Sequence, residues 1–186
     1  GRIGYAVFPT VKEADIFKTL NINYFSCVPP YNQEAAKEAL ENPLSKVAVK
    51  EMVETFEARR NLIWRQINEI PGITCQKPGG AFYLFPNISG VCENLGLIEK
   101  HQRLSKEQQS SPDNIFQMFA LYEHQVAVLD RKSFGQIGAD GKYFLRLSIA
   151  ADQAVLEEGV RRLKAASEDL SGLDKFLKER PDLIPA

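Results

Sequence analysis

Arg146 is the residue of this sequence best suited to bind an anion. It stands inside the apolar run "FLRLSIA" (144–150), between Leu145 and Leu147. A guanidinium stays charged in proteins, so burying it requires an anionic partner. Its planar fork suits a carboxylate, which can accept two parallel charge-assisted hydrogen bonds. The alternative is an arginine on an edge strand whose head reaches solvent.

Arg2 and Phe82 are the two other candidate binding residues. Arg2 lies in "GRIGYAVFPT", where a cation at the start of a strand beside a glycine suits phosphate binding, although many such arginines are simply solvated. Phe82 lies in "KPGGAFYLFPN", where a tight Pro-Gly-Gly turn precedes an aromatic strand. The alternative for Phe82 and Tyr83 is an ordinary place in the core. The two histidines lie on polar or helical segments, and we expect neither to be catalytic.

Composition argues against several classes of protein. The 186 residues include 23 basic and 24 acidic side chains, a net charge of −1, which gives no electrostatic footprint for nucleic acid or an anionic membrane. The three cysteines are odd in number and far apart, which predicts reduced thiols in the cytoplasm rather than a disulfide framework. With two histidines in addition, we expect no metal site. No apolar stretch approaches the ~18 residues of a membrane span.

Local patterns in the first part of the chain predict one strand followed by helices. The strand is expected over 3–8, and Thr10-x-x-Glu13 is a capping box that predicts a helix over 11–20. The loop "SCVPPYNQ" separates it from a helix over about 32–40. The longest helical pattern runs over 44–70, with apolar residues at three- and four-residue steps (Val49, Met52, Val53, Phe56, Ile63 and Ile67).

Beyond residue 72 the pattern changes to short strands mixed with helices. The runs "ITCQ", "GAFYLFPN", "VAVLD" and "YFLRLSIA" predict strands, and Asp140-Gly141 predicts a hairpin-type turn before the last of them. The polar stretch 99–114 is expected to be a surface excursion. Helices are expected at "DNIFQMFALYEH", capped by Asp113, after Asp152, and over 173–179. The whole indicates a small α+β unit reached through the long helix.

The order of several segments resembles one enzyme family. "GRIGYAVFPT", "FEARRNLI", "IPGITCQKPGGAFYLFPN", "VAVLDRKSFGQIGADGKYFLRLSIA" and "LEEGVRRLK" follow one another as in the C-terminal half of class I/II pyridoxal-phosphate-dependent aminotransferases, the aspartate/alanine/aromatic group. The resemblance runs from residue 1 to about 163. It implies an α/β fold of the aspartate aminotransferase type. Residues 1–44 would end the large cofactor-binding domain, 45–70 would form the interdomain helix, and 71–186 the small C-terminal domain.

The same resemblance implies roles for the three candidate residues. The arginine of the family's "G-x-R-[IL]-G" stretch binds the phosphate of the cofactor, and Arg2 stands there. The arginine of its "R-[LI]-S" strand binds the α-carboxylate of the substrate, and Arg146 stands there. Phe82, in "GGAFY", belongs to the stretch that shapes the substrate pocket. The implied cofactor is pyridoxal 5'-phosphate, the implied substrates are an amino acid and a 2-oxo acid, and the implied assembly is a homodimer in the cytoplasm.

Two departures from the family pattern qualify this hypothesis. The family has an aromatic residue directly before the phosphate-binding arginine, where this sequence has Gly1. The Schiff-base lysine, the aspartate that pairs with the pyridine nitrogen and the ring-stacking residues would all precede Gly1. We therefore expect no catalytic residue within the chain, the missing N-terminal part of the same protein as a partner, and residues 1–186 alone to be inactive. The alternatives are a ligand-sensing aminotransferase-like domain of a regulator, and a lyase or synthase that uses the same cofactor and fold.

Overall fold

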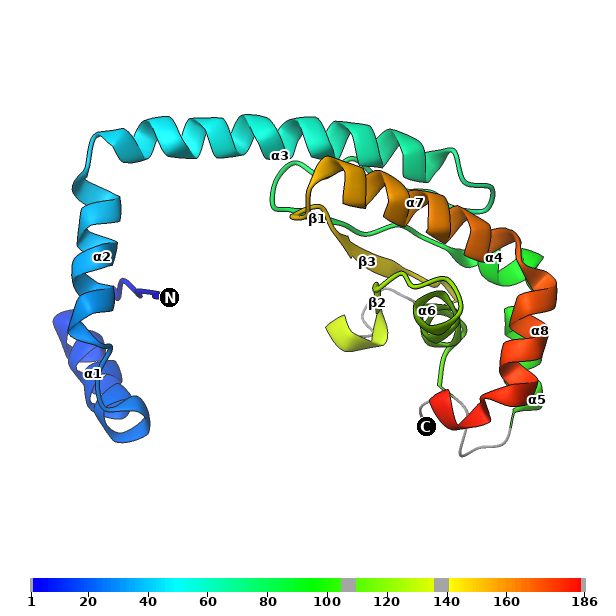
Figure 1. Ribbon diagram of the computed structural model, residues 1–186. Helices are drawn as coiled ribbons and strands as arrows, with labels where there is room; N and C mark the ends of the chain where they lie inside the picture. Colours follow the sequence, from blue (N-terminus) through cyan, green and yellow to red (C-terminus); the bar gives the residue numbers. More distant parts are fainter. Residues whose placement is uncertain (1, 105–109, 136–140, 185–186) are drawn as a thin grey trace. The chain divides into compact units, whose positions relative to one another are not determined.

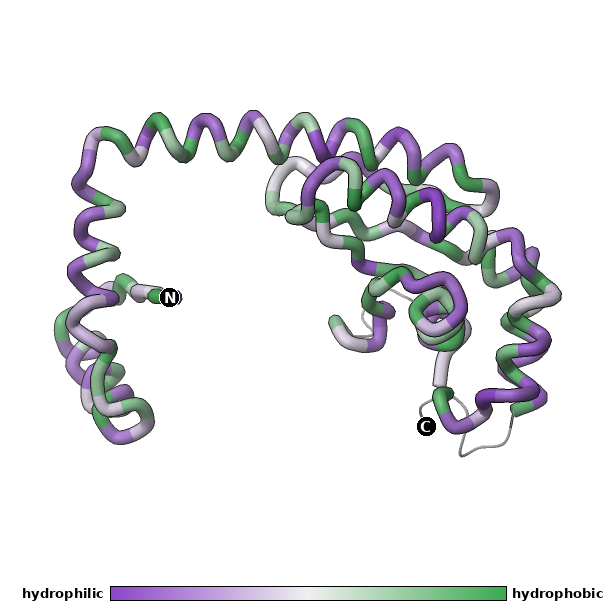
Figure 2. The backbone as a smooth tube through the Cα atoms, viewed as in Figure 1, coloured by the Kyte–Doolittle hydropathy of each residue, from purple (hydrophilic) through white to green (hydrophobic). Residues whose placement is uncertain are grey.

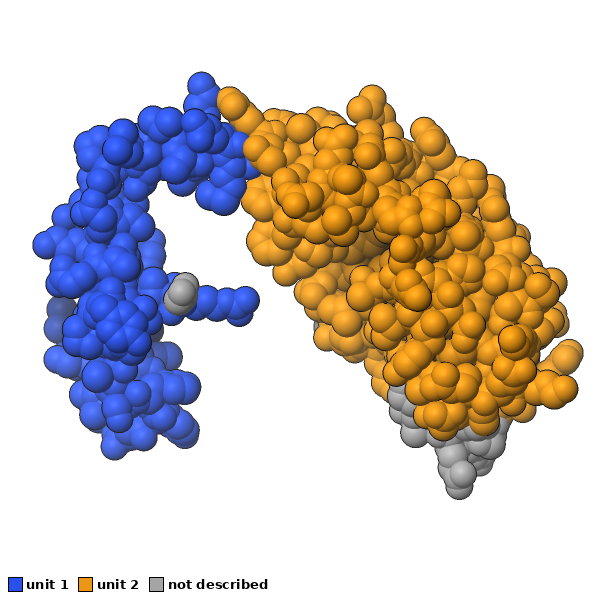
Figure 3. All heavy atoms as spheres, in the orientation of Figure 1, with its two compact units in different colours: residues 1–53 blue, residues 54–186 orange. Residues whose placement is uncertain are grey.

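The computed structural model describes residues 2–104, 110–135 and 141–184, and the chain forms two compact units. Unit 1 comprises Gly1–Val53 and unit 2 comprises Glu54–Ala186 (Figure 3). The division falls within α3 (Leu44–Asn68), the long helix expected over 44–70. The assignment of 1–44, 45–70 and 71–186 to three parts of a larger enzyme stays a prediction.

Unit 1 consists of α1 (Val11–Phe25), α2 (Pro30–Glu41) and the first turns of α3. The predicted capping box is confirmed, because the Glu13 backbone N–H donates to Thr10 Oγ1 at 3.3 Å and the Thr10 N–H donates to Glu13 Oε2 at 3.1 Å. The helix runs on beyond the expected end at residue 20. α2 begins at Pro30, earlier than expected, since a proline lacking an N–H fits the first position of a helix.

The strand expected over 3–8 is wrong. Residues 2–8 have no regular secondary structure, and the side chains of Ile3, Tyr5 and Val7 are 47%, 84% and 85% exposed. A strand requires a neighbouring strand to complete its hydrogen bonds, and no described residue of unit 1 belongs to one. None of the described residues 2–53 is buried, and eighteen large apolar side chains of this unit are exposed. Unit 1 therefore has no core of its own.

Unit 2 is built on a three-stranded antiparallel sheet. Its strands are β1 (Tyr83–Leu84), β2 (Leu129–Asp130) and β3 (Leu145–Ser148), in the order β1-β3-β2. All four segments expected to be strands contribute, but they are shorter than expected, and the first contributes only the bridge between Thr74 and Asn87. Because β3 is the central strand, the edge-strand alternative for Arg146 is wrong.

Unit 2 also contains helices, which lie beside this sheet (Figure 1). They are α4 (Ser89–Asn94), α5 (Leu97–Arg103), α6 (Pro112–Tyr122), α7 (Gln153–Glu168) and α8 (Leu170–Glu179), with short 3₁₀ turns η1 (Lys132–Phe134) and η2 (Pro181–Leu183). Two expectations need correction. α5 occupies the start of the expected surface excursion, of which residues 105–109 lie outside the described part. The cap of α6 is Ser111, whose hydroxyl accepts the Asn114 N–H, and not Asp113.

The core of unit 2 lies on one side of the sheet. Leu145 of the central strand and Ile149, which directly follows that strand, are 0% and 1% exposed, and α7 and the second half of α3 lie on the same side of the sheet in Figure 1. Ile63 and Ile67 of α3 are buried there. The apolar positions visible along the whole of α3 in Figure 2 are therefore covered only in its second half.

Three smaller expectations concern the remaining segments. α7 and α8 lie where Asp152 and residues 173–179 indicated helices. Asp140 of the expected hairpin turn lies outside the described residues, while Gly141 has a φ of +68°, the left-handed conformation that favours glycine. No helix among the residues that the structure describes is long and apolar enough to cross a membrane.

Candidate functional site

The guanidinium of Arg146 lies between two aromatic rings. Its Cζ is 4.4 Å from the centroid of the Tyr83 ring and 4.3 Å from that of Phe134. Tyr83 belongs to β1 and is paired with Ser148, two residues from Arg146, so the two side chains are diagonal neighbours on one face. Phe134 ends η1, which follows β2 on the other side of β3. The two rings thus reach Arg146 from opposite neighbours of its strand.

The charge of Arg146 has no acidic partner within the described part of the chain. Its half-buried side chain forms no hydrogen bond or ion pair with any residue that the structure describes. Other arginines of unit 2 do form ion pairs: Arg59 pairs with Asp152 at 3.4 Å and Arg60 pairs with Glu57 at 2.7 Å. No residue in the described ranges thus takes up the hydrogen-bond donors of Arg146, which are the groups that could bind an external anion.

Four exposed apolar side chains on the segments beside this cation form what we call the apolar rim. Phe82, Phe85, Leu129 and Phe134 are 41%, 40%, 37% and 46% exposed, which makes them half of the large exposed apolar side chains among the described residues of unit 2. Leu129 is the residue directly opposite Arg146 in the β2–β3 register. An apolar surrounding lowers the local dielectric, and the lower dielectric strengthens an ion pair with an incoming carboxylate.

The aromatic contacts continue along this face of the sheet. Phe85 meets Phe134 edge-on at 6.2 Å and stacks on Phe144 at 5.3 Å. The Arg131 guanidinium lies 5.4 Å from the Phe144 ring centroid. Phe144 and Arg146 therefore share one face while Leu145 lies in the core on the other, which confirms the alternation expected from the sequence.

Phe82 lies at the edge of the rim and not in the core. Its ring packs on Tyr83 at 4.5 Å and on Phe56 of α3 at 5.9 Å, and its carbonyl accepts the Ile149 N–H at 2.9 Å. The ordinary-core alternative is thus wrong for Phe82. Sequence reasoning did not connect Tyr83 or Phe134 with Arg146. The alternation of Tyr83 and Phe85 around Leu84 was the one sequence pattern that indicated aromatic side chains on one face of this strand.

Arg2, the second candidate anion-binding residue, is exposed in unit 1. Its side chain makes no hydrogen bond or ion pair with other residues in the described ranges. Arg2 and Arg146 belong to different units, and the structure does not place one relative to the other.

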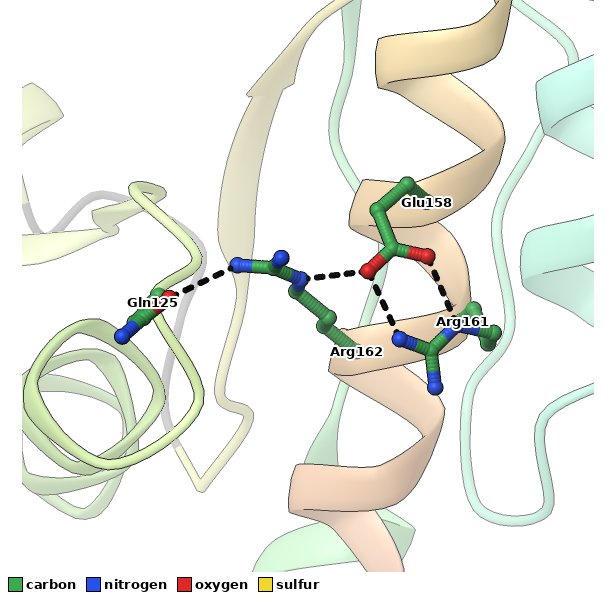
Figure 4. Close-up of polar contacts among 4 residues, drawn as sticks. All are labelled: Gln125, Glu158, Arg161 and Arg162. Atoms are coloured by element: carbon green, nitrogen blue, oxygen red, sulfur yellow. Dashed lines mark hydrogen bonds and ion pairs between the residues drawn. The ribbon is translucent and has the colours of Figure 1, made fainter.

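Two arginines of α7 differ from Arg146, because they donate hydrogen bonds to an acidic side chain (Figure 4). Arg161 donates to Glu158 through Nε at 2.7 Å and through Nη2 at 2.6 Å. Arg162 donates to Glu158 at 2.7 Å and to Gln125 at 3.1 Å. The hydrogen bonds from Arg161, then those from Arg162, lower the pKa of Glu158 to about 2. Both guanidinium groups therefore bind a carboxylate of this chain, in contrast to Arg146.

Curated relatives of the chain are aminotransferases. It is 39% identical to the probable aspartate/prephenate aminotransferase of Aquifex aeolicus over 91% of this chain and 38% of that protein. It is 32% identical to aromatic-amino-acid aminotransferase 2 of Thermococcus litoralis over 96% of this chain and 38% of that protein. The chain thus spans somewhat more than a third of the length of these relatives. No family model matches it.

Solved structures of similar fold carry related names. An aromatic aminotransferase from Pyrococcus horikoshii superposes with a TM-score of 0.62 at 28% identity, over 83% of this chain and 35% of that chain. An alanine aminotransferase from Pyrococcus furiosus superposes with a TM-score of 0.64 at 25% identity, over 87% and 36%. The matched portions are the C-terminal parts of these proteins.

Proposed function

We propose that this chain, which is related to the aspartate and aromatic aminotransferases and has the fold of their C-terminal portion, provides the substrate-carboxylate site of a pyridoxal-phosphate-dependent aminotransferase. Such an enzyme moves an amino group between an amino acid and a 2-oxo acid. The observation that carries the proposal is Arg146, whose guanidinium has two aromatic contacts, an apolar rim and no acidic partner among the described residues.

Arg146 would bind the group that both substrates share. An amino acid and a 2-oxo acid each carry an α-carboxylate, and a guanidinium fork accepts either one in the same two-pronged orientation. Fixing that carboxylate fixes the direction of the α-carbon, which is a large part of what an enzyme contributes to such a reaction. The rim, to which Phe82 belongs, would shape the pocket around the substrate side chain and exclude water from the ion pair.

Arg2 would hold the phosphate of the cofactor. Its exposed side chain is not engaged by another described residue, and a charge-assisted hydrogen bond to a phosphate oxygen suits a guanidinium. Pyridoxal 5'-phosphate, when bound, supplies the electron-withdrawing ring on which amino-group transfer depends. This chain would thus contribute two anion-binding arginines, and the catalytic groups would come from outside it.

Unit 1 supports the further proposal that the chain works together with the N-terminal portion of such an enzyme. Exposed apolar surface of this extent marks an interaction site. The relatives are more than twice as long as this chain, so they contain the material that could cover such a surface. We propose that residues 1–186 alone do not transaminate, and that the complete protein is a cytoplasmic homodimer, as the family resemblance implies.

The test uses the chain joined to the N-terminal portion of an aspartate aminotransferase, with both half-reactions measured for several amino acids. Arg146→Ala should lower kcat/KM for all of them by the equivalent of roughly 2–5 kcal/mol, because a desolvated charge pair loses one partner. Arg146→Lys should also lower kcat/KM, since an ammonium cannot make the two-pronged contact. Arg2→Ala should instead weaken cofactor retention, measured by dialysis and re-addition of pyridoxal phosphate.

Arg60→Ala is the matched control, because Arg60 is already paired with Glu57 and lies in neither proposed site. A value of kcat/KM unchanged by Arg146→Ala would refute the carboxylate site. Arg146-dependent elimination without amino-group transfer would favour the lyase alternative. Arg146-dependent binding without any turnover would favour the sensing domain.

A further inference from the structure

We infer that Tyr83 and Phe134 are positioning residues that make Arg146 selective for a planar carboxylate over a tetrahedral oxyanion. The inference rests on the proposed function of Arg146 as a carboxylate site. It adds the shape of the anion that the site accepts and the residues that set this shape.

The two rings limit the directions from which an anion can reach Arg146. The Cζ atom lies over both rings, at 4.4 Å from Tyr83 and 4.3 Å from Phe134, a distance at which cation–π attraction operates. The rings come from opposite neighbours of β3, and at these distances each takes up space beside the guanidinium that an anion would otherwise enter. The approach left to an anion lies between the rings, toward the N–H groups. A flat carboxylate fits a narrow approach with both oxygens, whereas a tetrahedral head is wider, because its third oxygen lies outside the plane of the other two.

The positions of both rings are fixed independently of Arg146. The Tyr83 backbone is held by its register with Ser148, and its ring packs on Phe82 at 4.5 Å. The Phe134 N–H donates to the Arg131 carbonyl at 2.8 Å, and the Phe85 ring lies edge-on behind Phe134 at 6.2 Å.

The segment that carries Phe134 is anchored as well, because the Ser133 hydroxyl donates to Asp130 at 2.8 Å. Each ring is therefore backed by a second ring and by backbone hydrogen bonds. The guanidinium is ordered before a ligand arrives, and a preorganised group loses less conformational entropy on binding.

The experiment compares benzoate with benzenesulfonate, which share the ring and the charge but differ in the shape of the anionic head. Binding to the whole chain is followed through the Arg146 Nε–H resonance in ¹⁵N NMR spectra, which reports on this side chain alone. The wild-type chain should bind benzoate more tightly than benzenesulfonate. Phe134→Leu and Tyr83→Leu should each weaken benzoate binding by about 2- to 30-fold, the range that one cation–π contact is worth, and should reduce the preference. Phe134→Tyr retains a ring and should retain the preference.

Tyr122→Leu is the matched control, because it removes a ring that lies 5.5 Å from the Arg180 guanidinium and makes no contact with Arg146. The Arg146 resonance should also shift in Phe134→Leu and Tyr83→Leu, since the ring currents are lost, and should stay unchanged in Tyr122→Leu. A preference for benzoate that survives both leucine variants, or that is absent from the wild-type chain, would overturn the inference.

Failure of the inference and failure of the proposed function give different results. Arg146→Lys lacks the Arg146 resonance, so its benzoate binding is measured by isothermal titration calorimetry beside the wild-type chain. If Arg146→Lys leaves benzoate binding intact, the carboxylate site itself is refuted. If Arg146→Lys abolishes binding while the leucine variants keep the preference, only the positioning role is refuted. Phe134 is 46% exposed, so its substitution should leave the fold intact, and Trp64 fluorescence verifies this.

Discussion

The buried carboxylate of Asp113 is the group on which we expect the geometry of the Arg146 face to depend. Asp113 lies in the first turn of α6 and is 4% exposed. Its Oδ1 accepts the Asn114 N–H at 3.2 Å, and its Oδ2 accepts the N–H groups of Arg131 at 3.3 Å and Phe144 at 3.5 Å. One oxygen thus joins the segment before η1 to the segment before β3.

The loss of stability expected for Asp113→Ala follows from the backbone N–H groups that it leaves without an acceptor. A backbone N–H left without a partner in the interior costs about 1–3 kcal/mol. The hydrogen bond from the Phe144 N–H is long and Phe144 is half-buried, so the free-energy cost of losing this bond should lie at or below the low end of this range. The lost negative charge at the N-terminus of α6 adds about 0.3–1 kcal/mol. We expect the free energy of unfolding to fall by about 2–4 kcal/mol, a large fraction of the stability of a typical domain.

The assay is urea unfolding followed by the fluorescence of Trp64, the only tryptophan of the chain. Its indole N–H donates to the Cys75 carbonyl at 2.8 Å, so the signal reports on unit 2. Glu69→Ala is the matched control, because it removes the same charge from an exposed position and should change stability by no more than about 0.5 kcal/mol. If Asp113→Ala destabilises no more than Glu69→Ala, Asp113 does not hold the two segments together.

Two further predictions concern titratable groups. Cys27 is exposed, whereas burial raises the pKa of the Cys75 and Cys92 thiols, so one thiol per chain should react rapidly with an aromatic disulfide at neutral pH, and Cys27→Ser should abolish that phase. Fast reaction of a second thiol would contradict this. The pKa of Glu158 is lowered from 4.5 to about 2, so its contribution to stability is present above pH 4.5 and is lost as the pH falls toward 2. A ¹³C NMR titration should find that midpoint, and Arg161→Gln should raise it toward 4.5; an unchanged midpoint would show that Arg161 does not cause the shift.

Elements with local signals could be predicted from the sequence, and elements that depend on a partner could not. The capping box of α1 and the three- to four-residue spacing of α3 lie within one segment, so the sequence reports them directly. The segment 3–8 has the composition of a strand but no described partner in unit 1, and composition cannot supply one. α5 was missed because its exposed residues are polar and its buried contact rests on Leu97, just before the polar stretch.

The candidate site, too, could be predicted only where its sequence pattern is local. Alternation along β3 placed Arg146 on the face opposite Leu145, since period 2 is a local property. The two rings that contact Arg146 come from other segments, Tyr83 from β1 and Phe134 from the turn after β2. Their meeting depends on the strand order β1-β3-β2, which no single segment reveals.

The two buried carboxylates among the described residues are both engaged by groups other than Arg146. Asp113 is occupied by backbone donors, and Asp130 accepts hydrogen bonds from Asn114 at 2.9 Å and Ser133 at 2.8 Å. Neither is left to neutralise Arg146. The cation–π contacts with the two rings, each worth about 0.5–2 kcal/mol, offset part of the hydration that the guanidinium loses. Among the described residues Arg146 is contacted by rings and not by an acid, and an arginine in such surroundings does not have to break an internal ion pair before it binds a carboxylate.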